Sequence, residues 1–296
     1  MESALTSAFV LLDADEARAR AAGHRALLEP WVTPHLERRR AGVAHPVEDF
    51  LFTYYSFSPS ALRRWHPGFG TVLAEAGELE HAKGYGAVAG GWGVTPDHVV
   101  GQRPLLEATA RLLEATAGRP ANFGCFGMHE WAMVFRLDPE RVRHAAWPLR
   151  LGATGTDAVV EGHRVACSHF DAYRFFTDEA RPLNTIRPGR DDRSAFEQPA
   201  CLHAGMDLYK HAFRLSPAVP SDLVADCFLL ARDIRVLDMR ASPYDFTALG
   251  YDPVRVETAE GKQEYAAAQR VFAERGGPLR RRLLDECRRL LVLVEP

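Results

Sequence analysis

Apolar residues recur at helical spacing over most of the chain, and this pattern predicts a mainly helical protein. The clearest segment is 221–240, where Ser221 is a good N-cap and an apolar stripe follows it, with acidic residues on another side. Segment 104–117 carries leucines and alanines at the same spacing and ends before Gly118, a residue that favours helix termination. Both segments are therefore predicted to be helices.

Further helices are predicted from runs of good helix formers. We expect them over 16–29, where Pro30 ends the first helix, over 204–214, and over 258–293 with a break near 276–278. A short helix from Asp138 through His144 is also expected, because an N-cap residue precedes a proline there.

Two stretches favour β-structure or turns. Val159 and Val160, a turn at Gly162, and then 165–167 read as two short strands, so a small β-hairpin insertion is predicted around 147–176. The glycine-rich stretch 84–93 is predicted to be a turn-rich connector or a short edge strand. No repeat or linker interrupts the chain. The expected fold is mainly α with a small β insertion (α+β), as a single globular domain over 1–296.

Composition narrows the class of protein. With 296 residues, 47% hydrophobic and 25% charged, the chain has the size and composition of a globular protein with a substantial core. Its formal net charge of -3 gives no overall positive field that would recruit nucleic acid, although a local basic face is compatible with it. The oligomeric state is not predicted.

The cysteines and the N-terminal residues indicate the cellular compartment of the protein. Five scattered cysteines predict reduced thiols rather than a disulfide framework. Asp13, Asp15 and Glu16 follow the first apolar residues closely, so no signal sequence is expected, and no apolar run approaches the roughly 20 residues of a spanning helix. We expect a cytoplasmic protein with no membrane partner.

The candidate chemistry lies in three stretches that each combine a cysteine, a histidine and an acid. They are Cys125 with His129 and Glu130, Cys167 with His169 and Asp171, and Cys201 with His203 and Asp207. A carboxylate beside an imidazole fixes the position of its proton, as general acid–base and metal-binding histidines require. All six histidines and acids are therefore candidate catalytic residues, although each pair alone is also common as a structural hydrogen bond.

Local spacing refines two of these stretches. At the end of the predicted strand, His169 and Asp171 would share one face. On the helix predicted over 204–214, Asp207 and His211 line one face with His203, at a spacing common among metal ligands. The predicted metal-ligand candidates are His129, His169, His203 and Asp207.

Aromatic and arginine residues supply candidate binding groups. Tyr54 and Tyr55 end a dense aromatic run, and Trp131 follows the first candidate cluster, so all three could stack on a planar substrate or else fill a core. Arg187 and Arg190 lie in a polar loop and could contact phosphates, with a solvated surface as the alternative.

Five stretches together resemble a family. They are HPVEDFLFTYY at 45–55, FGCFGMHEWAMV at 123–134, CSHFDA at 167–172, MDLYK at 206–210 and DMRASPYD at 238–245. This set resembles a group of actinobacterial proteins labelled 3-methyladenine DNA glycosylase, over nearly the whole chain. The sequence has neither the Leu-Pro-Gly-Val-Gly-like hairpin of helix-hairpin-helix glycosylases nor the ordered Cys and His cluster of the zinc-dependent ones, so the resemblance assigns no catalytic residue.

Two enzymatic hypotheses and one non-enzymatic hypothesis follow. The resemblance implies a DNA repair hydrolase that excises a damaged purine base, with DNA or a nucleobase-like small molecule as its partner. The residues themselves also fit a His and carboxylate centre that binds Zn, Fe or Mn and acts as a hydrolase or oxidase on a small substrate. The third hypothesis is a non-catalytic protein that binds a ligand in an aromatic-lined cavity.

Overall fold

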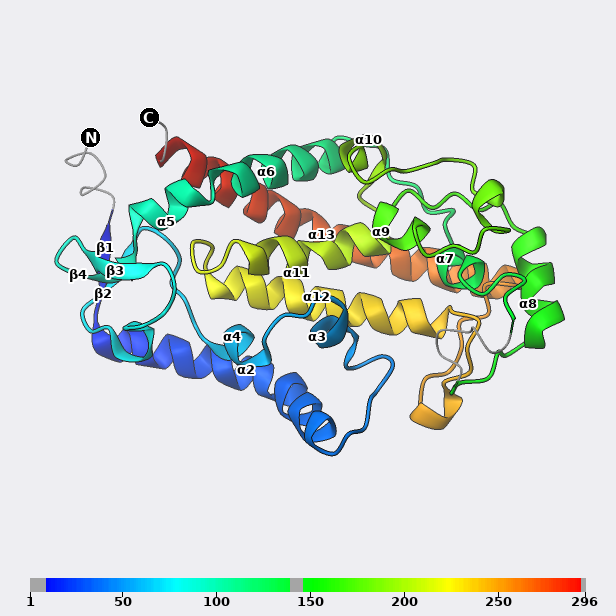
Figure 1. Ribbon diagram of the computed structural model, residues 1–296, viewed down its shortest axis with the longest axis horizontal. Coiled ribbons are helices and arrows are strands. Elements are labelled where there is room, and N and C mark those ends of the chain that lie inside the picture. The colour runs from blue at the N-terminus through cyan, green and yellow to red at the C-terminus, as the bar shows by residue number, and fades with distance from the viewer. Residues whose placement is uncertain (1–8, 139–145, 294–296) are drawn as a thin grey trace. The chain divides into compact units, whose positions relative to one another are not determined.

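The computed structural model describes residues 9–138 and 146–293 (Figure 1). Helices dominate these residues and a single four-stranded sheet accompanies them, so the mainly α prediction with a small β component is confirmed. None of the described helices is both long and apolar enough to cross a membrane. The helix predicted from Asp138 through His144 falls outside the described residues, apart from its first residue.

Contacts group the described residues into two compact units. Unit 1 comprises 9–113, 208–229 and 279–293, and unit 2 comprises 114–138, 146–207 and 230–278. The single domain over 1–296 stays a prediction.

Unit 1 contains the sheet and the N-terminal helices. Its complete elements are β1 (Val10–Leu12), α2 (Ala14–Arg40), α3 (Phe50–Tyr54), α4 (Pro59–Arg63), β2 (Thr71–Leu73), the 3-10 helix η1 (Gly77–Leu79), β3 (Tyr85–Val88), β4 (Gly91–Val94) and α5 (Pro96–Gly101). Parts of α6 (Arg103–Ala117), α11 (Leu202–Arg214), α12 (Ser221–Arg240) and α13 (Ala259–Leu293) complete it. The predicted helix over 221–240 is thus confirmed at both ends.

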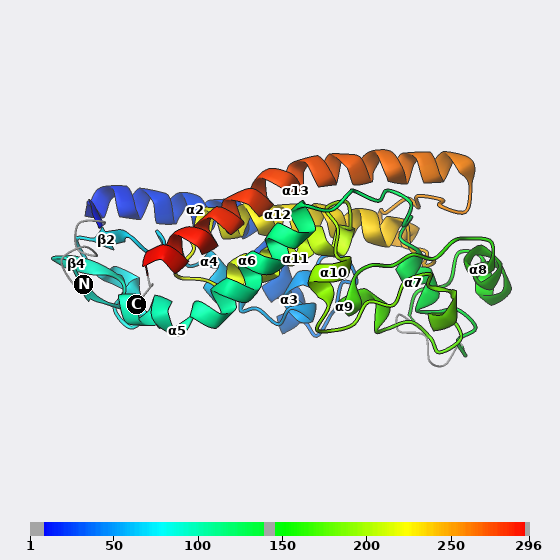
Figure 2. The same ribbon diagram turned by 90° about the horizontal axis from the view of Figure 1, so that it is seen from above.

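The sheet has the strand order β1-β2-β4-β3, with β1 parallel to β2 and the other pairs antiparallel. β3 and β4 form a hairpin whose turn residues Ala89 and Gly90 both have positive φ, so the glycine-rich stretch forms two strands and β3 is an edge strand. A Cβ on Gly91 would lie 2.7 Å from the carbonyl oxygen of Leu73, which explains the glycine. Figures 1 and 2 show the sheet at the N-terminal end of α2.

Two helices continue through prolines that were predicted to interrupt them. α2 begins at the N-cap Asp13, whose carboxylate accepts a hydrogen bond from the backbone N–H of Glu16 at 2.9 Å, and it continues past Pro30. Leu28 and Val32, on either side of this proline, are fully buried, so packing offsets the lost backbone hydrogen bond. α13 likewise runs through Pro278 without a break.

Unit 2 contains the short helices between α6 and α11. They are α7 (Met128–Ala132), α8 (Gly152–Glu161), α9 (Phe170–Tyr173), the 3-10 helix η3 (Arg181–Leu183) and α10 (Arg193–Phe196), and the 3-10 helix η4 (Thr247–Leu249) follows α12. Within this unit α11 packs closely on α12, because a Cβ on Gly205 would lie 2.8 Å from Cδ1 of Ile234.

The β-hairpin predicted around 147–176 is wrong. Val159 and Val160 lie in α8, where Thr156 joins them on a buried helical stripe, and Gly162 is the C-cap. Around Val165 the backbone pairs only in an isolated bridge to Asn184. Burial of one helix face therefore overrides the β-propensity of two adjacent valines.

Candidate functional site

α7 presents two of the predicted residues from an unusual backbone. Phe126 and Gly127, which precede it, both have left-handed φ values, of 47° and 67°. A bulky residue rarely adopts this conformation, and such outliers cluster at functional sites. The turn directs His129 and Glu130 into the interior, where both side chains are buried.

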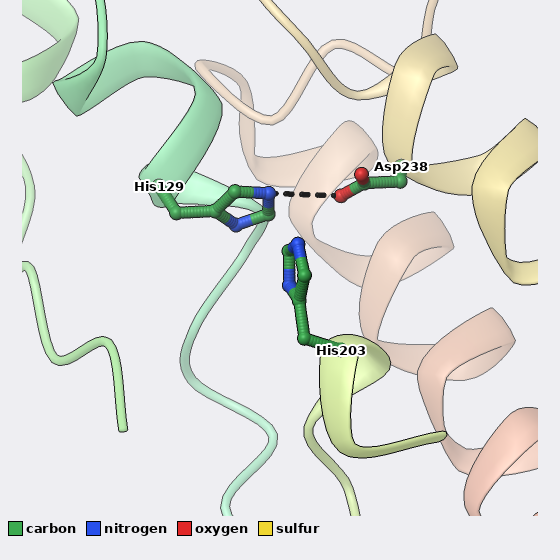
Figure 3. A group of neighbouring side chains, drawn as sticks. All are labelled: His129, His203 and Asp238. Carbon is green, nitrogen blue, oxygen red and sulfur yellow. Dashed lines mark ion pairs between the residues drawn. The ribbon is translucent and has the colours of Figure 1, made fainter. Parts of the chain in front are cut away.

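His129 meets two residues from other helices of unit 2 (Figure 3). Its Nε2 atom lies 3.1 Å from Oδ1 of Asp238, near the end of α12. The ring of His203, in the first turn of α11, stands edge-on to the ring of His129 with 4.3 Å between ring centroids. One ligand atom from each of the three residues lies within 4.8 Å of the other two. This separation is short enough for one metal ion to contact all three.

Arg235 fixes the orientation of Asp238. One turn earlier on α12, its Nη1 donates to Oδ2 of Asp238 at 2.9 Å and to Oε1 of Glu130 at 3.2 Å. Oδ1 of Asp238 is consequently the oxygen that faces His129. The same contact holds Glu130 beside the cluster, with its Oε1 at 3.7 Å from Nε2 of His129.

Two atoms at the centre of the cluster have no hydrogen-bond partner among the residues that the structure describes. Nε2 of His129 and Oδ1 of Asp238 are both buried, and despite their proximity they are not aligned for a hydrogen bond to each other. Buried polar atoms are rarely left in this state without an ordered water, an ion or a catalytic role. Together with His203, the pair could hold a metal ion.

The surrounding charges shift the pKa values of His129 and His203 in opposite directions. Burial opposes a charge on His129, but the Asp238 carboxylate prevails and holds the pKa of His129 well above its usual value. Burial and the neighbouring His129 charge lower the pKa of His203 to about 3. Burial alone would raise the pKa of Asp238, and the charge of His129 nevertheless holds it below its usual value. His203 is therefore a neutral imidazole, as a metal ligand must be.

A second cluster adjoins the first through His203. The ring of His169 lies 5.2 Å from that of His203 and nearly parallel to it. Nε2 of His169 lies 3.3 Å from Oδ2 of Asp207 and 3.6 Å from Oε1 of Glu197. Arg193 donates to both carboxylates, through Nη2 to Asp207 at 2.7 Å and through Nε to Glu197 at 2.5 Å.

The two clusters together hold more negative than positive side chains. Their buried carboxylates belong to Glu130, Asp238, Glu197 and Asp207, and their guanidinium groups to Arg235 and Arg193. Four carboxylates thus face two arginines. The raised pKa of His129 adds a positive charge that offsets part of this negative charge.

The cysteines of the three predicted clusters also face this region. Burial raises the pKa of Cys167 to about 12, and Cys125 adds to the shift. Burial raises the pKa of Cys201 as well, again with a contribution from Cys125 and Cys167. Without a bound metal, burial therefore favours the protonated form of both thiols.

The structure brings five of the six predicted catalytic residues into these two clusters. His129, Glu130 and His203 belong to the first, and His169 and Asp207 to the second. The predicted strand at His169 and Asp171 is wrong, because His169 is the N-cap of α9 and Asp171 lies in its first turn. The two side chains consequently share no strand face. Asp171 is half-buried and its Oδ1 lies 3.4 Å from Nε of Arg174.

The predicted substrate-binding residues have different environments. Trp131 is fully buried and donates from Nε1 to the carbonyl oxygen of Ala241 at 2.9 Å, so it presents no face for a stacked base. Tyr54 and Tyr55 belong to unit 1 and contact each other edge-on. Arg187 and Arg190 are exposed, which is compatible with either interpretation of their loop.

Sequence reasoning did not name Asp238, Arg235 or Glu197 as site residues, and it considered Arg193 only as a possible anion contact in the polar loop 184–193. Asp238 and Arg235 lie at helical spacing on α12, a segment whose other acids were expected to pair with nearby arginines or to join a metal site. For Asp238 a sequence signal existed, because this residue begins one of the five stretches that carry the family resemblance. No local pattern distinguished Glu197, which follows a polar loop.

No family model matches the chain, no curated protein matches it, and no solved structure matches it. The functional argument therefore depends on the geometry of the two clusters.

Proposed function

We propose that this chain is a metal-dependent hydrolase of a small substrate, with one divalent ion bound by His129, His203 and Asp238. The observation that carries the proposal is the convergence of these ligand atoms within 4.8 Å, with Nε2 of His129 and Oδ1 of Asp238 lacking hydrogen-bond partners. Two imidazoles and one carboxylate form a ligand set of catalytic zinc sites, in which water takes the remaining position. Zinc is therefore the ion we expect first, with iron and manganese as alternatives.

Glu130 would act on the water that such an ion activates. A bound zinc ion lowers the pKa of its water to about 7, and a nearby carboxylate then accepts the proton as the water attacks. Glu130 fits this role because its Oε1 lies 3.7 Å from Nε2 of His129, beside the proposed ion position. Arg235 restrains the same carboxylate through its contact at 3.2 Å.

Charge balance supports a divalent ion. With neutral imidazoles, the two clusters carry four carboxylates and two guanidinium groups, so two further positive charges neutralise them. A proton on His129 supplies only one. A divalent cation supplies both, and for that reason the buried region favours it over a monovalent ion.

The glycosylase activity implied by the family resemblance stays a prediction. The buried ring of Trp131 gives it no support, and the net charge of -3 does not favour a duplex. Release of free base from alkylated DNA by the metal-loaded protein, and its loss in Asp238→Asn, would assign that substrate to the same centre. Cytoplasmic location likewise stays a prediction.

The test begins with metal content. Protein purified without a metal-affinity tag is analysed by mass spectrometry for metals, stripped with a chelator and titrated with zinc, iron or manganese under anaerobic conditions. We expect one equivalent in the native chain and loss of binding in Asp238→Asn and His203→Ala. His163→Ala is the matched control, because within the described part of the chain His163 bonds through Nδ1 to the carbonyl of Val159, four residues earlier.

Turnover is tested with p-nitrophenyl acetate and bis(p-nitrophenyl) phosphate as probes. Glu130→Gln should keep the ion and lose about 10²- to 10⁴-fold in rate, the usual contribution of a general base. Substoichiometric metal that added ions do not change would refute the metal centre. Unchanged turnover in Glu130→Gln would refute its role while leaving the ion in place.

A further inference from the structure

The proposed metal ligands are shielded from solvent. His129 is 2% exposed and Asp238 is 0% exposed, while His203 is half-buried (Figure 3). A substrate that binds an ion at these residues therefore needs part of the surrounding chain to move aside. The segment that leads into α7, residues 118–127, adjoins this centre and contains no helix or strand.

The inner end of this segment touches the centre. Cys125 is close enough to His129 for a hydrogen bond that contributes to the raised pKa of that imidazole. The ring of Phe126 lies 6.2 Å from that of Tyr265, and a Cβ on Gly127 would lie 3.5 Å from the same ring. Left-handed backbone such as that at Phe126 is common in switch regions, and Gly127 tolerates a wide range of φ values. These two residues are therefore suited to act as a hinge.

Two glutamine side chains hold the outer part of the segment. Gln198 accepts a hydrogen bond from the backbone N–H of Asn122 at 3.0 Å and donates to the carbonyl oxygen of Asn122 at 3.3 Å. Gln269 donates to the same carbonyl oxygen at 3.5 Å and to that of Ala200 at 2.7 Å. Because the backbone N–H of Ala200 also donates to Gln198 at 2.8 Å, both glutamines connect Asn122 to the segment before α11.

The glutamines are buried, whereas the backbone that they hold is exposed. Gln198 is 6% exposed and Gln269 is 0% exposed, while Asn122 and Gly124 lie at the surface. Water can therefore replace the glutamines as partner of the Asn122 backbone when the segment lifts, so opening leaves no unsatisfied group on it. Two of the three bonds to Asn122 are also long, which makes them weak.

We propose that residues 118–127 form a lid over the buried centre of unit 2, held closed by Gln198 and Gln269 and opened by release of Asn122. Opening of the lid admits the ion and the substrate, and its closing excludes water from the reaction. The identity of what passes the lid rests on the proposed function, whereas the opening itself does not.

Cys125 reports on the lid, because it is half-buried on the lid itself and the other four cysteines are buried, namely Cys167, Cys201, Cys227 and Cys287. The metal-stripped chain is treated with N-ethylmaleimide, and each labelled cysteine is identified by peptide mass spectrometry. We expect native Cys125 to react more slowly than glutathione. In Gln198→Met it should react about 10-fold faster than in the native chain, because two hydrogen bonds to Asn122 are lost. The four buried cysteines should keep their native rates.

Arg119→Met is a second variant, at the start of the lid. Arg119 is half-buried and donates to the carbonyl oxygens of Ser194 at 2.6 Å and Glu197 at 2.9 Å, so its loss should also accelerate labelling of Cys125. Gln102→Met is the matched control. Gln102 is a half-buried glutamine of unit 1 whose Nε2 lies 2.8 Å from Nε2 of His98, and its replacement should leave the labelling rate of Cys125 unchanged.

Zinc transfer from the loaded protein to 4-(2-pyridylazo)resorcinol measures the passage of the ion. Its rate should rise in Gln198→Met by the same factor as the labelling of Cys125, and an unchanged rate would overturn the lid as the route of the ion. If the native chain binds no zinc, the proposed function falls and labelling alone decides on the lid. Equal acceleration at all five cysteines would indicate general unfolding and overturn the lid. The same rate at Cys125 in the native chain and all three variants would also overturn it.

Discussion

Nε2 of His129 and Oδ1 of Asp238 lie 3.1 Å apart, yet neither atom makes a hydrogen bond to any residue that the structure describes. An ion pair alone would align the N–H of the imidazole with the carboxylate oxygen. The ring of His203 stands edge-on to that of His129, and one ligand atom from each of the three residues lies within 4.8 Å of the other two.

The first prediction concerns thermal stability. An ion that binds only the folded chain stabilises it by about 2.7 kcal/mol at 100 times its dissociation constant. Added zinc should therefore raise the Tm of the stripped native protein, and chelator should reverse the rise. Asp238→Asn and His203→Ala should show no such rise, whereas His163→Ala should behave as the native chain. Equal rises in all four proteins would indicate binding elsewhere.

The second prediction concerns protons. The Asp238 carboxylate raises the pKa of His129, and a metal ion requires the neutral imidazole. Zinc binding should therefore release a proton and weaken as pH falls through the raised pKa. Calorimetric titration in buffers of different ionisation enthalpy measures this proton count. Affinity that stays constant between pH 8 and pH 6 would contradict the assignment of His129 as a ligand.

The third prediction concerns Arg235. Its replacement by methionine leaves Asp238 and Glu130 without the guanidinium that they share, at a cost of about 3–5 kcal/mol for a broken buried ion pair. Metal affinity should fall about 10- to 100-fold, as expected for loss of a residue that orients a ligand. Denaturant unfolding and zinc titration measure the two effects.

Arg232→Ala is the control for this variant on the same helix. Arg232 is 26% exposed and pairs with Asp233, so its loss should cost about 1 kcal/mol or less. Native zinc affinity in Arg235→Met would show that Asp238 keeps its orientation by other means.

The fourth prediction concerns pH and unit 1. Burial and the charge of Arg64 and His24 lower the pKa of His66 to about 4, and Nδ1 of His66 lies 3.1 Å from the hydroxyl of Tyr85. Between about pH 4 and pH 6.5, His66 is protonated in the unfolded chain but remains neutral in the folded chain. Stability should therefore fall as pH falls through this window, by up to about 3 kcal/mol from this group.

His66→Gln should flatten this part of the stability profile, measured by urea unfolding at several pH values. His203 acts in the same direction, because its pKa is lowered to about 3, so part of the slope should remain. The exposed His81 provides the control variant His81→Gln, which should leave the slope unchanged. An identical slope in His66→Gln would contradict the prediction.

The fifth prediction concerns two glycines in helices. A Cβ on Gly261 would lie 1.9 Å from the carbonyl oxygen of Arg255, so Gly261→Ala has to displace backbone and should cost about 1–3 kcal/mol. Nothing lies within 4 Å of a Cβ on the exposed Gly23 in α2, and Gly23→Ala should stabilise by about 1 kcal/mol. Thermal unfolding of both variants should show shifts of opposite sign.

Helical periodicity predicted both ends of α12, whereas the two longest helices, α2 and α13, were predicted to be interrupted at prolines through which they continue. The predictions at Pro30 and Val159 were wrong, because long-range packing determines the local structure at both positions. Leu28 and Val32 hold the helix through Pro30, and the buried face of α8 overrides the propensity of Val159.

The candidate site was only half predictable. His129 and His203 were identified because each follows a cysteine and has an acid nearby, which is a local pattern. Their actual partner, Asp238, lies on a distant helix and was hidden among the acids of α12. Asp207 pairs with His169 instead of His203, its helix neighbour. Spacing therefore identified the residue types, whereas tertiary packing chose the pairs.

His129, His203 and Asp238 lie on three different helices, α7, α11 and α12, so a shared ion would connect these helices. An ion held by all three cross-links segments that are far apart along the polypeptide, and it is retained only while these helices stay docked. Protease nicks at the exposed residues 190–192, between α9 and α11, would leave that cross-link intact in a gel-filtered complex. Chelation would then release the fragments or loosen their association, so the ion would report on the tertiary structure of unit 2.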